Sequence, residues 1–326
     1  MDFIFKEKTW PLNKPFNISR GSKTEAVTVE VNLRHNDFYG RGECVPYSRY
    51  QENTDAVIKQ LEGIKKGIQE EIIGLHNLHK FIEPGAARNA IDCALWDLEC
   101  KKNNKNIWSF MEIPKPQTIK TCYTIVLDTP KAMALDAKSH ENYPILKIKV
   151  NEKDLHDSMM SIRDAAPNPK IILDANEGLS VQSLDKLSDF LVSMNVSLME
   201  QPISSDADKD LLYFKSPIPL CADESFHSYD DLEDIFKKYQ YINIKLDKTG
   251  GLTEALKIAK KAKELQKGVM IGCMVGSSLS MLPALTLYEY ADYIDLDGPC
   301  FLKQDQLNGI KYDEGFIRLA EKMCWG

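Results

Sequence analysis

Eight short apolar segments, each about as long as a buried strand, recur through the last two thirds of the chain. They begin about every 20–30 residues between Thr121 and Pro299, and amphipathic helical patterns such as Leu252–Lys267 separate them. Strands that alternate with helices form parallel sheets with right-handed crossovers. Eight units at this spacing are typical of a (β/α)8 barrel. The segments read TCYTIVL, ILKIKV, IILDAN, SLMEQP, PLCADES, YINIKLD, VMIGCM and YIDLDGP.

The first third of the chain has a different pattern. Ala26–Leu33 alternates apolar and polar residues, which predicts a half-buried strand, and Lys6–Leu12 also has strand character. Apolar residues at helical spacing predict helices over Thr54–Gln69 and Ala86–Lys102. We therefore expect a compact α+β domain over residues 1–115, ahead of the barrel.

Charge and hydropathy argue against several classes of partner. The formal net charge is −7 and there is no basic stripe, so we expect neither nucleic acid nor an anionic membrane surface as a partner. The uncharged run Gly268–Tyr288 is long enough to span a bilayer, but glycine, serine and proline residues interrupt it. We interpret this run as a buried strand, a loop and a buried helix.

The cysteines indicate a reducing compartment. The eight cysteines are dispersed and never form a CxxC pair, so the sequence predicts neither a disulfide framework nor a zinc site. Acidic and lysine residues interrupt the apolar stretch Met1–Trp10, which is unlike a signal peptide. We expect a cytoplasmic protein with reduced thiols.

Charged residues interrupt or end six of the eight apolar segments. In a parallel barrel the carboxyl ends of the strands form one mouth, where active sites lie. Side chains alternate between the two faces of a strand, so Lys147 and Lys149 should point the same way, into the barrel and towards acidic groups of neighbouring strands. Buried charges of both signs need partners or a metal. The residues are Lys147, Lys149, Asp174, Asn176, Glu200, Asp223, Glu224, Lys245, Asp247, Asp295 and Asp297.

Three of these side chains form a potential metal site. Asp174, Glu200 and Asp223 end successive strands and offer oxygen ligands without Cys or His, which favours Mg²⁺ over zinc. Lys149 and Lys245 lie on strands that face one another across the barrel, so they suit proton transfer on the two faces of one substrate. A nearby cation and Lys147 would lower the pKa of a lysine, as a base requires.

The motifs KIKV, LDAN, MEQP, CADES and NIKLDKTGG occur in this order and resemble the enolase superfamily, within it the muconate-lactonizing-enzyme subgroup. The resemblance covers essentially the whole chain. It implies a modified TIM barrel, (β/α)7β, over residues 116–300, with an N-terminal α+β capping domain over 1–115. Residues 301–326 would return to the capping domain. The chemistry carried over is proton abstraction by lysine and a metal-stabilised enediolate.

Within this subgroup the chain is most similar to the dipeptide epimerases, whose members invert the second residue of substrates such as L-Ala-L-Glu. The resemblance implies that Asp174, Glu200 and Asp223 bind Mg²⁺ and that Lys149 and Lys245 are the acid/base catalysts. Further residues are carried over with roles in binding. They are Lys147 for the substrate carboxylate, Asp295 and Asp297 for its ammonium group, Arg20 or Lys23 for an acidic side chain, and Asn176 and Glu224 around the metal ligands.

Other readings stay open. An N-acylamino-acid racemase, an o-succinylbenzoate synthase or a cycloisomerase of the same subgroup would share the metal and lysine residues. The pair Asp295 and Asp297 separates them, since a substrate without a free ammonium group has no use for it. A barrel that serves as a scaffold without catalysis is the alternative outside enzymology. By resemblance we also expect a homo-oligomer.

Overall fold

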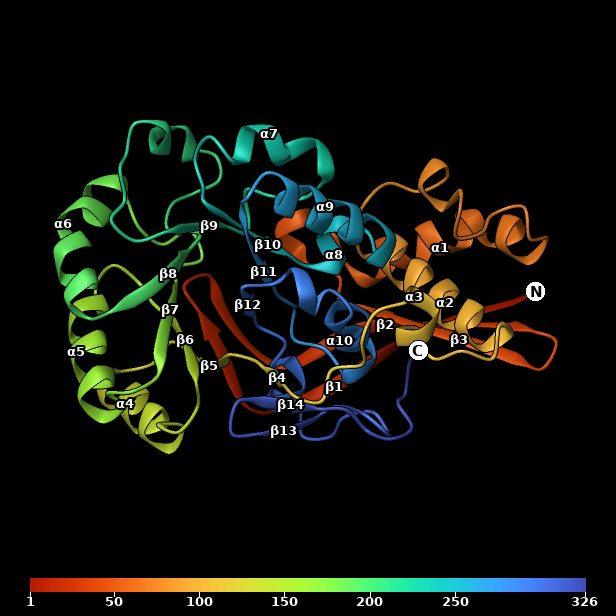
Figure 1. The fold of residues 1–326 in the computed structure, drawn as a ribbon, viewed down its shortest axis with the longest axis horizontal. Coiled ribbons are helices and arrows are strands. Elements are labelled where there is room, and N and C mark those ends of the chain that lie inside the picture. The colour runs from red at the N-terminus through yellow and green to blue at the C-terminus, as the bar shows by residue number, and fades with distance from the viewer.

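The computed structural model describes residues 1–326, and eight parallel strands form its largest sheet (Figure 1). The hydrogen-bonded order runs from β5 to β12 without a crossover. The Cys122 amide, just before the first strand, donates to the Ile294 carbonyl of the last strand at 2.8 Å, which closes the ring. The strands are β5 Tyr123–Ile125, β6 Ile145–Lys149, β7 Lys170–Asp174, β8 Val196–Glu200, β9 Leu220–Ala222, β10 Tyr241–Ile244, β11 Gly268–Ile271 and β12 Tyr293–Ile294.

Seven connections join these eight strands, which confirms the (β/α)7β arrangement. Six contain an α-helix, and the one between β8 and β9 contains only the short helix η3. Local signals start several of these helices: Pro130 occupies the first turn of α4, and the Thr129 side chain accepts from the Ala132 amide. The elements are α4 Pro130–Ser139, α5 Leu155–Ala165, α6 Val181–Ser193, η3 Asp208–Leu212, α7 Leu232–Ile235, α8 Leu246–Thr249, α9 Leu252–Glu264 and α10 Ser278–Leu285.

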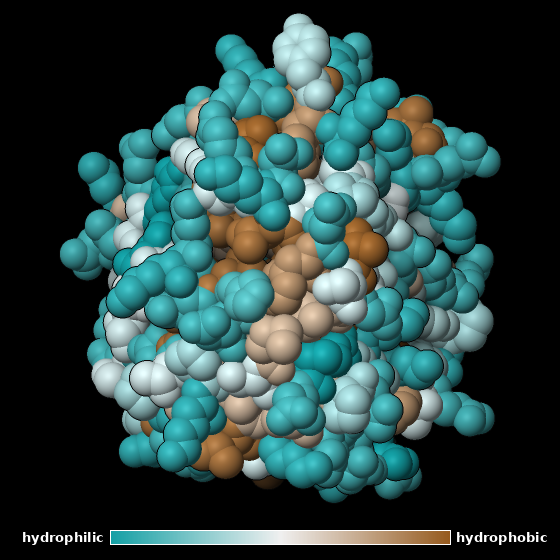
Figure 2. Space-filling model, turned by 90° about the vertical axis from the view of Figure 1, so that its left-hand side faces the viewer, coloured by the Kyte–Doolittle hydropathy of each residue, from teal (hydrophilic) through white to brown (hydrophobic).

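The outer face of α4 to α6 is mostly hydrophilic, with small apolar patches (Figure 2). Exposed apolar side chains on these helices include Leu135, Met160 and Val192. No helix of the chain combines the length and the hydropathy that crossing a bilayer requires. The run Gly268–Tyr288 forms β11, a loop and the buried helix α10, as its glycine and serine residues predicted.

Alternation along the strands divides apolar from polar side chains. Leu146, Ile148 and Val150 point outwards into the large apolar cluster beneath the helices. Ile145 points inwards and joins a small separate cluster that fills the barrel, with Cys122, Ile172, Leu198, Cys221 and Met270. This cluster closes the barrel below Lys147 and Lys149, so polar side chains reach solvent only at the mouth.

The N-terminal domain is an antiparallel sheet covered by two helices. Its elements are β1 Asp2–Ile18, β2 Gly21–His35, β3 Phe38–Cys44, α1 Thr54–Gln69 and α2 Ala86–Lys102. Strand β3 was not predicted, because two glycines break its apolar pattern. Both bring the strand against α2: a Cβ at Gly42 would lie 2.0 Å from the Ala90 carbonyl oxygen.

The C-terminal segment leaves the barrel and lies against both parts of the molecule. Strand β14 Phe316–Arg318 pairs with β13 Lys311–Asp313 on one side and with β4 Ile119–Lys120 on the other. The Trp325 indole then donates to the Cys93 carbonyl of α2 at 2.9 Å.

Buried polar contacts join α2 to the barrel turn α8. The Arg88 guanidinium donates to the Thr249 and Gly250 carbonyls at 2.7 and 3.0 Å. The Asn89 amide donates to Asp247 Oδ1 at 2.8 Å. Because these groups are buried, the two domains meet in a fixed register.

Candidate active site

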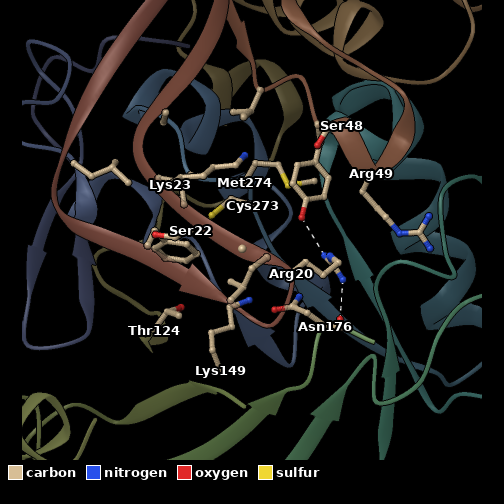
Figure 3. A pocket seen from close by; sticks show the side chains of 18 of the residues that line it. Arg20, Ser22, Lys23, Ser48, Arg49, Thr124, Lys149, Asn176, Cys273 and Met274 are labelled. Carbon is tan, nitrogen blue, oxygen red and sulfur yellow. Dashed lines mark hydrogen bonds between the residues drawn. The ribbon is translucent and has the colours of Figure 1, made fainter. Parts of the chain in front are cut away.

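A cavity of about 720 Å³ lies at the mouth of the barrel, beneath two loops of the N-terminal domain (Figure 3). The turn between β1 and β2 and the loop Val45–Arg49 form its roof. Its floor carries polar side chains from β5, β6 and the loops after β7, β9, β10 and β12. They are Thr124, Lys147, Lys149, Asn176, Asp223, Glu224, Lys245, Asp295 and Asp297.

Lysine and carboxylate groups alternate around this floor. Lys149 Nζ donates to Asp174 Oδ2 at 2.5 Å, and Lys245 Nζ donates to Asp223 Oδ2 at 2.7 Å. The strands that carry Lys149 and Lys245 are four positions apart in a ring of eight, so the two lysines approach from opposite sides. The structure thus brings together the lysines and carboxylates that the sequence grouped.

Lys147 lies between them and contacts several acidic groups. Its Nζ lies 2.6 Å from Glu200 Oε2, 3.1 Å from Asp174 Oδ2 and 2.7 Å from Asp295 Oδ2. Only the contact with Asp295 has the geometry of a hydrogen bond. Burial alone would lower the pKa of Lys147, but attraction to these three carboxylates raises it well above its usual value. Lys147 is therefore a permanent cation.

The three strand-end carboxylates repel one another. Burial and the charges of Asp174 and Asp223 raise the pKa of Glu200 to about 7. Burial also acts to raise the pKa of Asp223, but Lys245 and Lys248 outweigh it and hold the pKa well below its usual range. Lys147 and Lys245 act to lower the pKa of Glu200, but they do not outweigh burial and the two neighbouring carboxylates.

These residues fit a bound divalent cation. The buried oxygens without a hydrogen-bond partner include four near these carboxylates: Glu200 Oε2, which lies 2.6 Å from Lys147 Nζ, Glu224 Oε2, Asn176 Oδ1 and Asn243 Oδ1. Hard oxygen ligands of this kind suit Mg²⁺. In this arrangement Asp174 and Asp223 each accept a hydrogen bond from a lysine, and no three acidic, histidine or cysteine side chains are grouped so that they could hold a metal ion.

The pKa of Lys245 differs from the sequence-based expectation. Burial acts to lower it, yet attraction to Asp223 and Glu200 raises it well above the usual lysine value. The expectation assumed that a cation occupied the carboxylates. Here the ammonium group pairs with Asp223 directly, which explains the opposite direction.

Asp295 and Asp297 follow β12 and line the cavity two residues apart. Asp295 Oδ2 accepts from Lys147, whereas Asp295 Oδ1 is buried without a partner. Asp297 Oδ2 accepts from the Thr124 amide at 2.7 Å. Burial and the neighbouring Asp295 raise the pKa of Asp297 to about 7. The pair can therefore accept further hydrogen bonds from a cationic ligand, such as an ammonium group.

The structure separates the two cations of the β1–β2 turn. The Arg20 guanidinium lies 2.6 Å from Glu224 Oε1 and 3.1 Å from Glu177 Oε2, and it donates to the Asn176 carbonyl at 2.8 Å (Figure 3). Lys23 has no carboxylate partner and lies over the Tyr47 ring, 5.1 Å from its centroid. Desolvation lowers the pKa of Lys23. Arg20 thus holds the roof to the barrel, and Lys23 remains available to a ligand.

Glu177 also joins the roof of the cavity to the barrel, and it was not predicted from the sequence. It accepts from Arg49 at 2.9 and 3.0 Å and from the Ser205 amide at 2.9 Å. Asn176 Nδ2 donates to Glu224 Oε1 at 3.3 Å, which places both predicted neighbours of the metal ligands in the same network. No sequence motif marks Glu177, since it follows the strand end by three residues.

Two inward-pointing residues of the barrel were also missed. Asn243 Nδ2 donates to Glu200 Oε1 at 2.8 Å, and Thr124 anchors Asp297. The alternation of side chains along a strand could have identified both residues. Asn243 precedes Lys245 by two residues and Thr124 follows the inward-pointing Cys122 by two, so both should point into the barrel.

Comparison with known proteins gives matches over nearly the whole chain. Residues 1–111 match the mandelate racemase / muconate lactonizing enzyme N-terminal domain, and residues 131–325 match the enolase C-terminal domain-like family. The L-Ala-D/L-Glu epimerase of Escherichia coli K12 is 38% identical, over 96% of this chain and 98% of that protein. An N-acetyl-D-glutamate racemase of a Pseudoalteromonas species is 39% identical, over 91% and 95%.

A solved structure resembles the fold as a whole. The dipeptide epimerase of Cytophaga hutchinsonii, complexed with Mg and the dipeptide D-Ala-L-Val, superposes with a TM-score of 0.89 at 27% identity. The match covers 97% of this chain and 92% of that one.

Proposed function

The chain belongs to the mandelate racemase / muconate lactonizing enzyme family of the enolase superfamily, and from this premise we propose that it is a Mg²⁺-dependent dipeptide epimerase. The proposed reaction inverts the α-carbon of the second residue of L-Ala-L-Glu. The dipeptide assignment depends on the pair Asp295 and Asp297, which lines the same cavity as the two lysines and leaves Asp295 Oδ1 without a hydrogen-bond partner.

Lys149 and Lys245 would exchange the α-proton from opposite faces. One lysine removes the proton as a neutral base, and the other, as an ammonium group, returns a proton to the opposite face. Their positions four strands apart support this division of roles. Lys147, held cationic by three carboxylates, would contact the substrate carboxylate and oppose its developing negative charge.

Mg²⁺ bound by Asp174, Glu200 and Asp223 would further stabilise the negative charge that develops on the substrate carboxylate. General acid–base catalysis contributes about 10²–10⁴-fold, which is too little for removing a proton next to a carboxylate. Dipeptide epimerase structures with Mg support this choice of cation.

The deciding experiment is proton NMR of L-Ala-L-Glu in D₂O with the purified protein and Mg²⁺. Loss of the Glu α-proton signal together with appearance of L-Ala-D-Glu would support the proposal. Absence of exchange with every dipeptide would contradict it.

A racemase acting on N-acetylglutamate is the second candidate, and the Pseudoalteromonas relative favours it. Its substrate keeps the glutamate α-carbon and side chain but has no ammonium group. Racemisation of N-acetyl-L-glutamate faster than epimerisation of L-Ala-L-Glu would decide for this candidate. The substrates of both candidates carry the acidic glutamate side chain, for which Lys23 is the available cation.

Lys23→Gln tests how that side chain is recognised. We expect KM for L-Ala-L-Glu to rise about tenfold or more, since a hydrogen bond to a charged group contributes about 1.5–3 kcal/mol. KM for L-Ala-L-Leu should not rise. Lys6→Gln, an exposed lysine of the same sheet that does not line the cavity, is the control. Equal effects on both dipeptides would remove Lys23 from the recognition site.

Binding of the dipeptide should also depend on the ionisation of Asp297. Its pKa in the folded chain is raised to about 7, so the carboxyl is protonated and neutral below that pH. Attraction for the ammonium group is therefore present above pH 7 and lost as the pH falls through it. Besides Asp295, the charged group acting on Asp297 is Lys147, which opposes the rise. Calorimetric titration with L-Ala-L-Glu at pH 6 and pH 8 should show weaker binding at pH 6, and Asp297→Asn should flatten the difference.

We further propose that the protein is a cytoplasmic homo-oligomer. All eight cysteines are free thiols, and five of them are buried, which suits a reducing compartment. Leu212 and Tyr213 lie next to one another with 46% and 91% exposure, which is consistent with a surface that a second copy covers.

A further inference from the structure

We infer that Lys248 is a positioning residue that fixes the orientation of Asp223, so that only one oxygen of this carboxylate faces the active site. The inference rests on the proposed metal site but not on the choice of dipeptide. It assigns a function to a third lysine of the barrel mouth, one that neither removes nor donates the substrate proton.

Lys248 binds two atoms of Asp223. Its Nζ donates to the main-chain carbonyl at 2.6 Å and to Oδ1 at 2.7 Å. The ammonium group also lies 5.6 Å from the centroid of the Phe226 ring. The side chain of Lys248 is fully buried, so no water replaces these contacts. Asp223 is thereby held through both its backbone and its side chain.

Lys245 and Lys248 approach Asp223 from different sides. Lys245 lines the large cavity and binds Oδ2, whereas Lys248 binds Oδ1 and lines a separate polar cavity of about 340 Å³. The second cavity lies between the loop Tyr50–Glu52 and the strand ends. Because Oδ1 accepts from Lys248, Oδ2 is the side-chain oxygen that Asp223 turns towards Lys245 and the large cavity.

The N-terminal domain holds Lys248 in place. Lys248 belongs to α8, and Arg88 and Asn89 of α2 bind this turn through the carbonyls of Thr249 and Gly250 and through Asp247. Gly250 has φ +78°, and a Cβ there would lie 2.3 Å from Arg88 Nε. The contact with α2 thus fixes α8, and α8 directs Lys248 at Asp223.

A buried lysine beside Asp223 would weaken the binding of a cation there, unless the lysine also holds this carboxylate in the orientation that the cation needs. A buried ammonium group repels a divalent ion, and its own desolvation is costly. Groups that orient metal ligands typically change affinity by about 10–100-fold when they are removed. The pairing of Lys248 with Asp223 Oδ1 is an arrangement of this type.

The test is calorimetric titration of Mg²⁺ into the full-length chain without substrate. Lys248→Met should raise the Kd for Mg²⁺ at least about tenfold. Lys248→Gln keeps an N–H donor and should lose less. The control is Lys238→Met, which removes a lysine that is mostly buried, with 9% of its side chain exposed, and that pairs with Asp208 at 2.8 Å on another part of the barrel. It should lower stability without changing the Kd.

The outcomes separate the inference from the proposed function. An unchanged Kd in Lys248→Met, or an equal rise in Lys238→Met, would overturn the positioning role while the metal site stands. Absence of Mg²⁺ binding by the unaltered chain would overturn the metal site itself. If Lys248→Met does not fold, Lys248→Ala takes its place, and an unchanged Kd in that variant would overturn the inference.

Discussion

Lys149→Ala and Lys245→Ala are each expected to slow epimerisation of L-Ala-L-Glu by about 10³-fold or more. Inversion needs a base on one face of the α-carbon and an acid on the other, and each variant lacks one of them. The two lysines approach from strands four positions apart and pair with different carboxylates, so neither can replace the other. Polarimetry or proton NMR starting from each epimer would measure the loss.

Isotope exchange gives this prediction its sharper form. In D₂O each single variant should still exchange the α-proton of one epimer, because the remaining lysine can remove a proton and return a deuteron to the same face. The two variants should differ in which epimer they exchange. Lys170→Ala, at the exposed opposite end of the barrel, is the control and should behave as the unaltered chain does. Epimerisation within tenfold of normal in either active-site variant would refute the two-base mechanism.

Asp297→Asn should reduce kcat/KM for L-Ala-L-Glu by about 10²-fold or more, and Asp295→Asn should have an effect of similar size. Removing one partner of a buried charge pair costs about 2–5 kcal/mol, and each 1.36 kcal/mol is a factor of ten in rate. Both substitutions preserve the shape of the side chain. Asp295 also pairs with Lys147, so its replacement should lower kcat as well as raise KM.

The matched control is Asp292→Asn. Asp292 lies one residue before β12, and its carboxylate accepts a hydrogen bond from the Val269 amide. It should leave kcat/KM unchanged. The comparison substrate is N-acetyl-L-glutamate, for which Asp297→Asn should cause no loss, since that molecule has no ammonium group. A loss of equal size with both substrates would mean that Asp297 supports the fold of the mouth instead of binding an ammonium group.

The barrel was predictable because its strands are buried on both faces. Strand segments then read as short apolar runs, and polar residues inside them stand out, as Lys147 and Lys149 do. The helices at Thr54–Gln69 and Ala86–Lys102 were predicted with their observed bounds because their apolar spacing is regular.

The remaining features depend on contacts between distant segments. Strand β3 was missed because Gly40 and Gly42 matter only through their contact with α2. Arg20 and Lys23 could not be distinguished, since their difference lies in Glu177 and Glu224, more than 150 residues away. Lys248 had no visible partner in the sequence, because Asp223 precedes it by 25 residues and follows a different strand, β9.

The polar contacts between α2 and α8 limit how this enzyme can be recombined with its relatives. A chimera that imports an entire N-terminal domain must also import matching partners for Thr249, Gly250 and Asp247, or it will misplace the turn that carries Lys248. Grafting the Ser19–Lys23 hairpin tip alone leaves those contacts untouched. On the proposed role of Lys23, preference for the substrate side chain would change with the tip of one hairpin, while the position of Lys248 would be inherited with the helix behind it.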